Sequence, residues 1–434
     1  MATYDLDRTE LNHLLAPNID PAARAAVVDY LLNHGGFDDD DDHDHHHGHD
    51  RDDDDRHHGR DHDDRSHHDH HSDPAVKVEV SDGTLPLDPQ AQVLDLTSAT
   101  NTVTTDASLK VIVENVAGDA DLTVQGENDV MIVTGAGNDH VTLQDSGNDV
   151  VLTGAGNDVV TGGDGQDSIY GGGGNDSLTA GTGDHQLLVG GDGHDTLVGG
   201  DGSHDSLYAG SGSDSLQAGS GDNQLLVGGS GHDTLVGGDG SHDSLYGGSG
   251  SDTLLAGNGD HQLLVGGSGH DTLVGGDGSH DSLYGSGGSD YMHAGNGDHQ
   301  LLVGGDGNDT LYGGDGAYDT LMGGSGRDLM YGGSGSHQLL VGNNGNDTMY
   351  AGTGGDTLQG GSGNDVFHVD NHHGSDTIDG SSGNDVVNFG TRASTDISSL
   401  HTSGGVTVIH FNDGQSVTVS HVENLVFTDK TDHL

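Results

Sequence analysis

Aspartate recurs at one fixed position of a glycine-rich, nine-residue pattern that fills the middle of the chain. The stretches GGDGHDTLV (190–198), GGSGHDTLV (228–236) and GGDGNDTLY (304–312) all follow G-G-x-G-x-D-x-U-x, where U is a large aliphatic residue. Calcium is a hard cation that takes about six to eight oxygen ligands from carboxylates and backbone carbonyls. Glycines leave the carbonyls of a tight turn exposed, and the Asp adds a carboxylate at the end of the turn. The pattern therefore predicts calcium bound between stacked turns.

The spacing of the pattern alternates between nine and ten residues. One step of each kind makes a 19-residue coil, and identical side chains recur every 38 residues, at every second coil. The nine-residue turns then form one edge of a stack, which we call the narrow edge, and the ten-residue turns form the opposite, wide edge. On the narrow edge we predict a regular column of calcium ligands: Asp139, Asp158, Asp176, Asp195, Asp214, Asp233, Asp252, Asp271, Asp290, Asp309, Asp328, Asp347 and Asp365.

On the wide edge, turns of the type GDGSHD alternate with turns that read GDHQ or GDNQ. The candidate calcium ligands there are Asp149, Asp167, Asp205, Asp243, Asp281, Asp319 and Asp356. Glutamine replaces the aspartate at Gln186, Gln224, Gln262, Gln300 and Gln338. Because a neutral amide is a poorer calcium ligand than a carboxylate, we predict that the wide edge is calcium-poor or differently coordinated. Duplication of a 38-residue unit is the alternative explanation of the alternation, and the sequence leaves both open.

Short strands must position these turns. The three residues after each Asp are predicted to form a strand whose middle member, such as Leu197, Leu207 or Leu216, points into a narrow core. The flanking residues face outward, and after the ten-residue turns pairs such as Leu187 and Val189 make an apolar face, which is typical of a contact surface. Coils of two strands and two turns would stack roughly 4.8 Å apart as parallel sheet. The expected fold is therefore all-β: a right-handed parallel β-roll with a small N-terminal head and a β-rich C-terminal cap.

This repeat resembles that of the RTX (repeats-in-toxin) family of calcium-binding proteins, over some 235 residues of this chain. The resemblance implies a secreted β-roll that a type I system exports through an uncleaved C-terminal signal. The stretch GVTVIHFNDGQSVTVSHVENLVFTD (405–429) resembles the segment that closes RTX rolls and leads into that signal. We predict a hairpin there, with Val406, Val408 and Phe411 alternating before a turn at Asp413 and Gly414.

The composition narrows the class of protein. The chain has 434 residues, 80 of them glycine, no cysteine, and a formal net charge of −61. Only 29% of the residues are hydrophobic, which is too few for an ordinary globular core, whereas periodic glycine indicates a repeat architecture. So much negative charge opposes compaction unless cations neutralise it, and it argues against nucleic acid and anionic membranes as partners. No apolar run approaches the length of a membrane span, and the first residues, MATYDLDRTE, do not resemble a cleaved Sec signal.

Histidine is the second potential metal ligand. In the turns it occurs at His194, His232 and His270, at His204, His242 and His280, and at His185, His261 and His299. Histidines of one set lie two coils apart, roughly 9.6 Å by the strand spacing, which is too far to share a zinc ion, so we interpret them as exposed turn residues. Residues 38–73 contain 16 Asp and 12 His. Zinc or nickel could bind there through His45, His46, His47, His67, His68, His70 and His71; a solvated acidic linker with incidental metal affinity is the interpretation we favour.

Five regions follow from these patterns. We expect a helical head over 1–36, a disordered Asp/His-rich linker over 37–74, and a β-rich cap with calcium-free starter coils over 75–133. The calcium-binding roll covers 134–385, and the C-terminal cap with the type I secretion signal covers 386–434.

The sequence offers no enzyme signature that we recognise. Neither H-E-x-x-H nor G-x-S-x-G occurs, and the segments outside the repeat are too short for the catalytic domains that accompany other RTX rolls. We expect a non-enzymatic, extracellular or cell-surface protein that serves as a matrix or adhesion component. Its expected partners are calcium ions, a type I secretion apparatus, and cell-surface polysaccharide or a second copy held through the apolar face. Extracellular transition-metal sequestration is the alternative. Ice binding is disfavoured, because the variable turn residues do not form a flat array of Thr and Asn.

Overall fold

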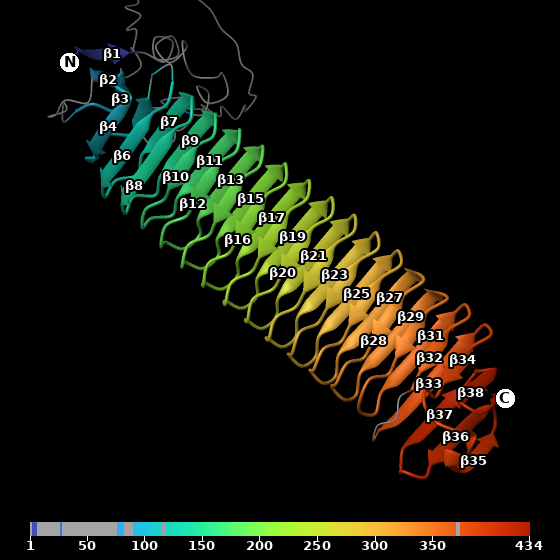
Figure 1. Ribbon diagram of the computed structural model, residues 1–434. Coiled ribbons are helices and arrows are strands. Elements are labelled where there is room, and N and C mark those ends of the chain that lie inside the picture. Colours follow the sequence, from blue (N-terminus) through green and yellow to red (C-terminus); the bar gives the residue numbers. More distant parts are fainter. Residues whose placement is uncertain are drawn as a thin grey trace, which may run out of the picture.

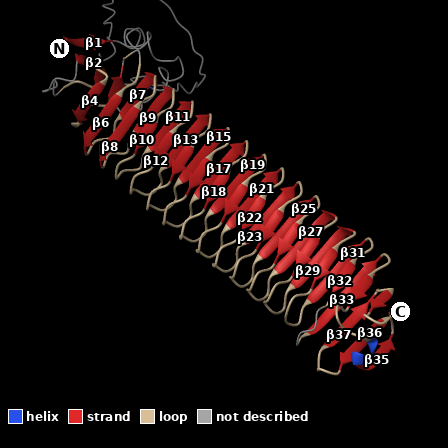
Figure 2. Ribbon diagram, viewed as in Figure 1, coloured by secondary structure: helices blue, strands red, loops and turns tan. Residues whose placement is uncertain are grey.

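Short parallel strands stack along one axis into a long solenoid, with the chain passing from one end to the other (Figure 1). The computed structural model describes residues 2–6, 27, 76–81, 90–114, 116, 118–369 and 374–434. Strands and turns alternate along the stack, and among the described residues one short 3-10 helix, η1 (Ser394–Asp396), lies near the C-terminal end (Figure 2). No helix long and apolar enough to cross a membrane occurs among the described residues.

One sheet, sheet A, follows the ten-residue turns and contains the longer strands. Its parallel strands are β2 (Val76–Ser81), β3 (Val93–Leu96), β5 (Val111–Glu114), β7 (Met131–Ala136), β9 (Val150–Ala155), β11 (Ser168–Gly173), β13 (Leu187–Asp192), β15 (Ser206–Ser211), β17 (Leu225–Ser230), β19 (Ser244–Ser249), β21 (Leu263–Ser268), β23 (Ser282–Gly287), β25 (Leu301–Asp306), β27 (Thr320–Gly326), β29 (Leu339–Gly345), β31 (Thr357–Ser362), β33 (Ser375–Ser382) and β37 (Ser416–Ser420). Each pairs with the next in this order.

The second sheet, sheet B, faces sheet A and contains mostly three-residue strands. In order of pairing they are β4 (Thr100–Thr104), β6 (Asp121–Gly126), β8 (His140–Asp145), β10 (Val159–Thr161), β12 (Ser177–Thr179), β14 (Thr196–Val198), β16 (Ser215–Gln217), β18 (Thr234–Val236), β20 (Thr253–Leu255), β22 (Thr272–Val274), β24 (Tyr291–His293), β26 (Thr310–Tyr312), β28 (Leu329–Tyr331), β30 (Thr348–Tyr350), β32 (Val366–His368), β34 (Val386–Asn388) and β38 (Asn424–Val426). These strands are parallel, and β39 (Thr431–His433) closes the sheet antiparallel to β38.

The register of the pairing confirms the 19-residue coil. Leu188 pairs with Leu207, and the inward residue of sheet A advances by 19 residues at each pairing from Ile169 to Leu340. Coils of 18 residues flank this run, where Val151 pairs with Ile169 and Leu340 with Leu358. Because every coil has the same length within the run, equivalent turn residues lie directly above one another.

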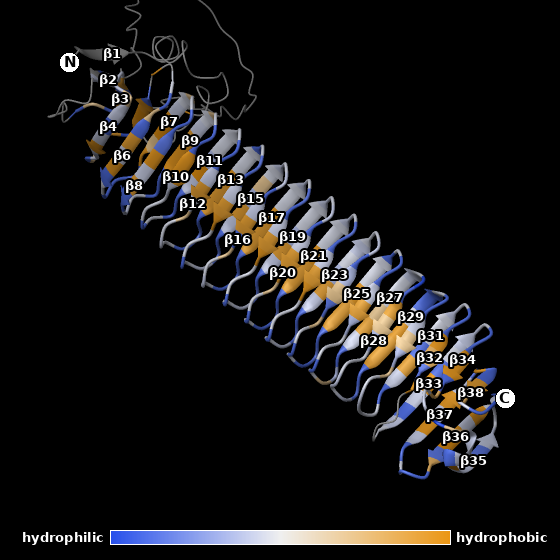
Figure 3. Cartoon of the chain, in the orientation of Figure 1, coloured by the Kyte–Doolittle hydropathy of each residue, from blue (hydrophilic) through white to orange (hydrophobic). Residues whose placement is uncertain are grey.

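The core is one file of aliphatic side chains between the two sheets. Leu197, Leu207 and Leu216 are completely buried, as predicted, and so are the equivalent residues of the other repeats. The residues that flank them in each strand are partly exposed, in the alternation expected for a pleated strand. In Figure 3 the hydrophobic colour follows the strands as a stripe, whereas the turns at both edges are hydrophilic. With so thin a core, most polar groups of the turns must find partners in neighbouring coils.

The ends of the stack differ from the sequence predictions in two details. Within the expected helical head, Ala2–Leu6 forms strand β1, which pairs antiparallel with β2. The free edge of β2 accepts this short β-compatible segment, which explains the difference; of the predicted helices only Val27, a buried helical residue, lies within the described residues. The rest of 1–36 lies outside them.

At the C-terminal end the predicted hairpin is present, but Val406 and Val408 do not share the buried face with Phe411. Strand β36 (Val406–Phe411) pairs antiparallel with β37 and with β35 (Ile397–Ser403). Ile409 and Phe411 are buried together with Thr407, whereas Val406 is exposed. Successive side chains of a strand point to opposite faces of the sheet. Val406 and Val408 therefore lie on one face of the strand and Phe411 lies on the other.

Candidate metal centres along the two edges

The thirteen predicted aspartates of the narrow edge form one continuous column. They lie where each sheet A strand turns into the following sheet B strand, and none is more than 3% exposed. One carboxylate oxygen, Oδ1, accepts the backbone N–H of the aspartate one coil earlier. Asp233, for example, accepts from Asp214 at 2.9 Å and donates through its own N–H to Asp252 at 2.8 Å. This ladder joins every coil to the next and fixes the carboxylates inside the turns.

The second carboxylate oxygen, Oδ2, has no hydrogen-bond partner in most of these aspartates. This holds for Asp158, Asp176, Asp195, Asp214, Asp233, Asp252, Asp271, Asp290, Asp309, Asp328, Asp347 and Asp365. A buried anionic oxygen without a partner costs several kcal/mol by order of magnitude. In the part of the chain that the structure describes, the fixed positive charges in ion pairs belong to Arg392 and Lys430, which contact other aspartates. Neither of these two ion pairs therefore places a positive charge on the unpartnered Oδ2 atoms.

Glycine keeps the space beside most of the orphaned oxygens open, although Thr153 and Ala209 hold the equivalent positions before Asp158 and Asp214. A Cβ atom on Gly228 would lie 2.5 Å from Oδ2 of Asp233 and 2.7 Å from the carbonyl oxygen of Gly247, one coil further on. The same cradle recurs at Gly247, where Oδ2 of Asp252 and the carbonyl oxygen of Gly266 are each 2.6 Å from such a Cβ. A carboxylate and a carbonyl from successive coils thus border a space that a side chain would fill. This donor set fits calcium, which prefers oxygen ligands of both kinds.

The environment of these carboxylates opposes their charge. Burial, together with the like charges of Asp214 and Asp252, raises the pKa of Asp233 to about 6, against the lowering effect of the hydrogen bond from the Asp214 N–H. Burial likewise raises the pKa of Asp271 to about 6 and that of Asp328 to about 7. Desolvation and like charges both disfavour the ionised form, and a bound cation would counteract both by stabilising the carboxylate charge.

The predicted aspartates of the wide edge are buried in the same way. Asp149, Asp167, Asp205, Asp243, Asp281, Asp319 and Asp356 are all 2% exposed or less. Where sheet B turns into sheet A, Oδ1 of Asp243 accepts the backbone N–H of Gln224 at 2.8 Å. Burial raises the pKa of Asp243 to about 6 and that of Asp356 to about 7. The ladder of the wide edge is interrupted at alternate rungs, however. Among the described residues, Oε1 of Gln224, Gln262 and Gln300 accepts no hydrogen bond, whereas Gln186 and Gln338 accept the N–H groups of Asp167 and Asp319.

Each of the five wide-edge glutamines uses its amide nitrogen to occupy the turn. Nε2 of Gln262 donates to the carbonyl oxygen of Gly240 in the preceding coil at 2.6 Å, and the amide also lowers the pKa of Asp243 by interacting with its carboxyl group. Gln186, Gln224, Gln300 and Gln338 make the equivalent bond to a glycine carbonyl. A neutral N–H donor thus contacts the same two oxygen types, carbonyl and carboxylate, that line the glycine cradles of the narrow edge.

Two aspartates that the sequence prediction omitted extend the columns. Asp385 continues the narrow edge, since its Oδ1 accepts the N–H of Asp365 at 2.8 Å, and burial raises its pKa to about 6. Asp376 continues the wide edge by accepting the N–H of Asp356 at 3.1 Å. Asp385 lies in the stretch GSSGNDVVN (380–388), whose glycine and aspartate positions match the repeat and could have revealed it. Asp376 lies in the stretch GSDTI (374–378), which matches only the last part of the repeat, G-x-D-x-U.

The turn histidines of the wide edge are closer together than predicted. His204 and His185 stack with ring centroids 4.9 Å apart, and His242, His261 and His280 stack at 5.0 Å. Histidines of one set do lie two coils apart, but the other wide-edge set fills the same turn position on the coils between them, so neighbouring rings are only one coil apart. His194, His232 and His270 lie on the narrow edge, where Ser213 and Ser251 separate them. The histidines of residues 38–73, including His45, His46, His47, His67, His68, His70 and His71, lie outside the described residues.

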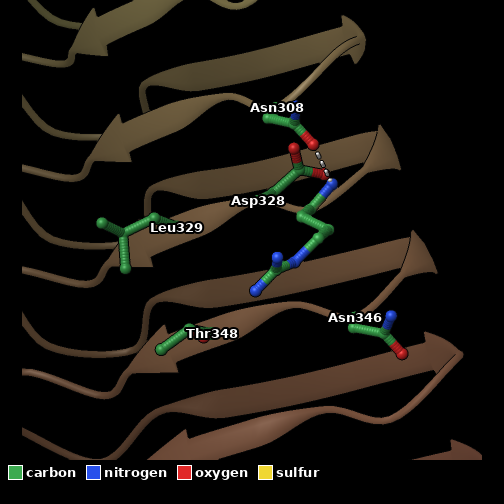
Figure 4. Close-up of a pocket in the computed structure, with 6 residues that line it drawn as sticks. Asn308, Asp328, Leu329, Asn346 and Thr348 are labelled. Carbon is green, nitrogen blue, oxygen red and sulfur yellow. Dashed lines mark hydrogen bonds between the residues drawn. The ribbon is translucent and has the colours of Figure 1, made fainter.

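A pocket of about 320 Å³ opens on the narrow edge between successive coils. Its lining consists of Asn308, Arg327, Asp328, Leu329, Asn346 and Thr348 (Figure 4). Arg327 takes the turn position that Asn308 and Asn346 hold in the adjacent coils, and its N–H donates to Oδ1 of Asn308 at 2.8 Å. These residues contain no paired nucleophile and base, so the pocket is a gap between repeated turns rather than a catalytic constellation.

Comparison with known protein families agrees with this geometry. The model of the RTX calcium-binding nonapeptide repeat matches the chain at residues 143–178, 180–203, 200–227, 227–260, 261–279, 265–298, 299–317, 318–336, 341–371 and 374–391. These segments cover more than half of the chain, which therefore belongs to the family of proteins with RTX calcium-binding repeats. The comparison with curated proteins found no match.

Proposed function

We propose that this RTX protein is a secreted, non-enzymatic β-roll that folds on binding calcium outside the cell. The single observation that carries the proposal is the narrow-edge column of buried aspartates whose Oδ2 atoms have no partner. Their carboxylates are held in place by the ladder of N–H bonds, so a cation can bind without rearranging the turns. Metal binding free energy then becomes folding free energy.

The narrow edge carries the main file of calcium ions in this proposal. Its ligands are the carboxylates of the thirteen predicted aspartates and of Asp385, together with glycine carbonyls of adjacent coils. On the wide edge, aspartate turns bind calcium, whereas the amide of each glutamine takes the place of an ion. The bond from Gln262 to the Gly240 carbonyl supports this assignment, because a coordinated carbonyl lone pair and an amide donor compete for the same side of the oxygen.

Calcium affinity decides where the protein folds. Extracellular calcium modules typically bind at roughly 10⁻⁴ to 10⁻³ M, a concentration that the cytosol does not provide. The chain would therefore remain unfolded during synthesis and export, and would fold when it meets calcium outside. Export through a type I secretion apparatus, directed by residues 386–434, is consistent with this order of events. Deletion of this segment is expected to retain the protein inside an expressing cell that has a type I exporter.

We place the folded roll at the cell surface or in an extracellular matrix, as an adhesion or scaffold component. The outward face of sheet A supports a contact role, since Leu187, Val189, Leu225 and Val227 are partly exposed on it. Such a face suits polysaccharide or a second copy of the roll. Binding of the calcium-loaded protein to extracted cell-surface polysaccharide, and sedimentation over a range of protein concentrations, distinguish these two partners.

A calcium titration of the full chain tests the proposal. In calcium-depleted buffer at neutral pH, far-ultraviolet circular dichroism should show little β-structure, and calcium should restore it cooperatively. Magnesium at the same concentration is the control, because it demands a tight octahedral shell and releases its water reluctantly. Full β-structure in excess chelator at neutral pH would contradict calcium-driven folding.

Transition-metal sequestration by residues 38–73 is the second candidate function, and non-enzymatic zinc or nickel binding there is favoured by the density of histidine. Deletion of 38–73 from the full chain separates the two. Loss of nickel binding with unchanged calcium-dependent folding assigns the transition metal to the tract and calcium to the roll.

A further inference from the structure

The extra residue of each ten-residue turn has a backbone conformation of its own. Compared with the six-residue stretch GGDGQD (162–167), the stretch GGDGSHD (199–205) contains one additional residue before the aspartate. In the structure this residue is His204, with φ of 66°, and the equivalent histidines include His185, His242, His261, His280 and His299, with φ between 62° and 67°. A left-handed residue projects its side chain away from the turn, and all six histidines are exposed. We call this set the imidazole column. Tyr318 and His337 hold the same position on the next two coils, where Tyr318 separates the imidazoles of His299 and His337.

The imidazole column is in register along the wide edge. His242, His261, His280 and His299 stack without interruption, with centroids 5.0 Å apart and ring planes within 6° of parallel. Asn223 separates this group from the pair His185 and His204. For the column, the hydrogen bonds found within the described residues involve the backbone N–H groups and not the ring nitrogens. The rings can therefore rotate without breaking a bond.

Imidazole nitrogen is a ligand for zinc, copper and nickel rather than for calcium. Metal–nitrogen bonds of about 2.0–2.1 Å place two nitrogens of one ion roughly 2.8 to 4.2 Å apart, depending on whether the ligands are cis, tetrahedral or trans. Neighbouring rings 5.0 Å apart can reach this separation by a small rotation, whereas rings two coils apart cannot. No group of three ligand-type side chains converges among the described residues, so a site in the column has two imidazoles, and solvent completes the shell.

We propose that the wide edge binds divalent transition-metal ions, each between two adjacent imidazoles of the column. Four consecutive histidines provide two such sites, His242 with His261 and His280 with His299, and the pair His185 and His204 provides a third. These sites are distinct from the calcium sites in ligand chemistry and in position. The imidazoles become neighbours only when the coils stack, so nickel or zinc binding here requires the folded roll; this part of the proposal rests on the proposed calcium-driven folding.

Two double variants of the full chain test the need for adjacency. Both are made in a full-length background whose 12 histidines within residues 38–73 are replaced by asparagine, which removes competing imidazoles. His242→Asn with His261→Asn leaves His280 and His299 as neighbours, whereas His261→Asn with His299→Asn leaves His242 and His280 two coils apart. Asparagine is the matched replacement, since Asn223 holds the same turn position with φ of 62°.

Nickel binding is measured by equilibrium dialysis at saturating calcium, with circular dichroism as the check on folding. We expect three tight nickel ions in the background protein, two in the first variant and one in the second. Equal nickel binding by the two variants overturns the proposal, because both retain the same number of histidines. The comparison is decisive even if folding proves independent of calcium, since it depends only on the register of the coils. In calcium-depleted, unfolded protein the column sites should be absent, and undiminished nickel binding there also contradicts the proposal.

Discussion

Acid should partly replace calcium in folding this protein. The perturbation is a shift from pH 7.5 to pH 5 in the absence of calcium. Burial raises the pKa of Asp233, Asp271 and Asp290 to about 6, from an ordinary value of 3.8. A group whose pKa is raised in the folded state stabilises that state fully below its unfolded pKa and ceases to do so as pH rises through the folded value. The calcium-free roll is therefore favoured below about pH 6 and disfavoured at neutral pH.

The magnitude follows from the same values. A shift from 3.8 to about 6 corresponds to at most roughly 3 kcal/mol per carboxylate at neutral pH, at about 1.4 kcal/mol per pKa unit. Five such groups would cost on the order of 15 kcal/mol, which equals the upper range of the stability of a whole domain. At neutral pH the calcium-free roll should therefore unfold rather than bury these charges. Near pH 5 protonation removes most of the cost.

The assay is far-ultraviolet circular dichroism of calcium-depleted protein across this pH range, with light scattering to exclude aggregation. We expect β-structure to return with a midpoint near pH 6, well above the isoelectric point of about 4.3. A variant with His194, His232 and His270 replaced by Asn is the control, because imidazoles also titrate in this range. Its transition should remain. The reasoning is refuted if soluble, calcium-free protein stays unfolded at pH 5, or if the histidine replacements abolish the transition.

The remaining predictions concern calcium affinity, the glutamines and the turns. Protons and calcium compete for the aspartates, so the calcium midpoint measured by circular dichroism should rise when the pH is lowered from 7 to 5.5. The share of this rise that is due to imidazolium charge beside the narrow edge should disappear when His194, His232 and His270 are replaced by Asn. The double variant Gln224→Glu with Gln262→Glu should bind more calcium ions per protein, because each change replaces an amide donor by a carboxylate. Equilibrium dialysis counts the ions, and an unchanged count would contradict the role assigned to the amides. Leu245→Ala should destabilise the calcium-loaded roll by about 2–5 kcal/mol in urea, since Leu245 is completely buried, whereas Gly404→Asn, where φ is 60° and no atom lies within 4 Å of a new Cβ, should change stability by less than about 1 kcal/mol.

Much of the architecture could be predicted because the repeat specifies each coil locally. The spacing of Leu197, Leu207 and Leu216 fixes which residues point inward, and the 19-residue period fixes which residues meet in the next coil. The aspartate column follows directly from these two facts. Its use as a calcium site is an inference from oxygen chemistry that the orphaned Oδ2 atoms support.

Other features depend on how coils contact each other, which the pattern alone does not express. The amide of Gln262 reaches the Gly240 carbonyl of the preceding coil, and the sequence indicated only that a carboxylate was missing there. The sequence assigns His261 and His280 to different sets because their neighbours in sequence differ, but the stack places their rings 5.0 Å apart.

The sequence by itself determined the repeat, the inward leucines and the positions of the carboxylates, because glycine turns and a strict period leave one register in which every leucine is buried. Only the tertiary structure decided what lies beside each carboxylate. The buried carboxylate of Asp233, for example, accepts the N–H of Asp214 from the coil before it and shares a glycine cradle with the carbonyl of Gly247 from the coil after it. These contacts join adjacent coils, and their distances follow from stacking rather than from local sequence.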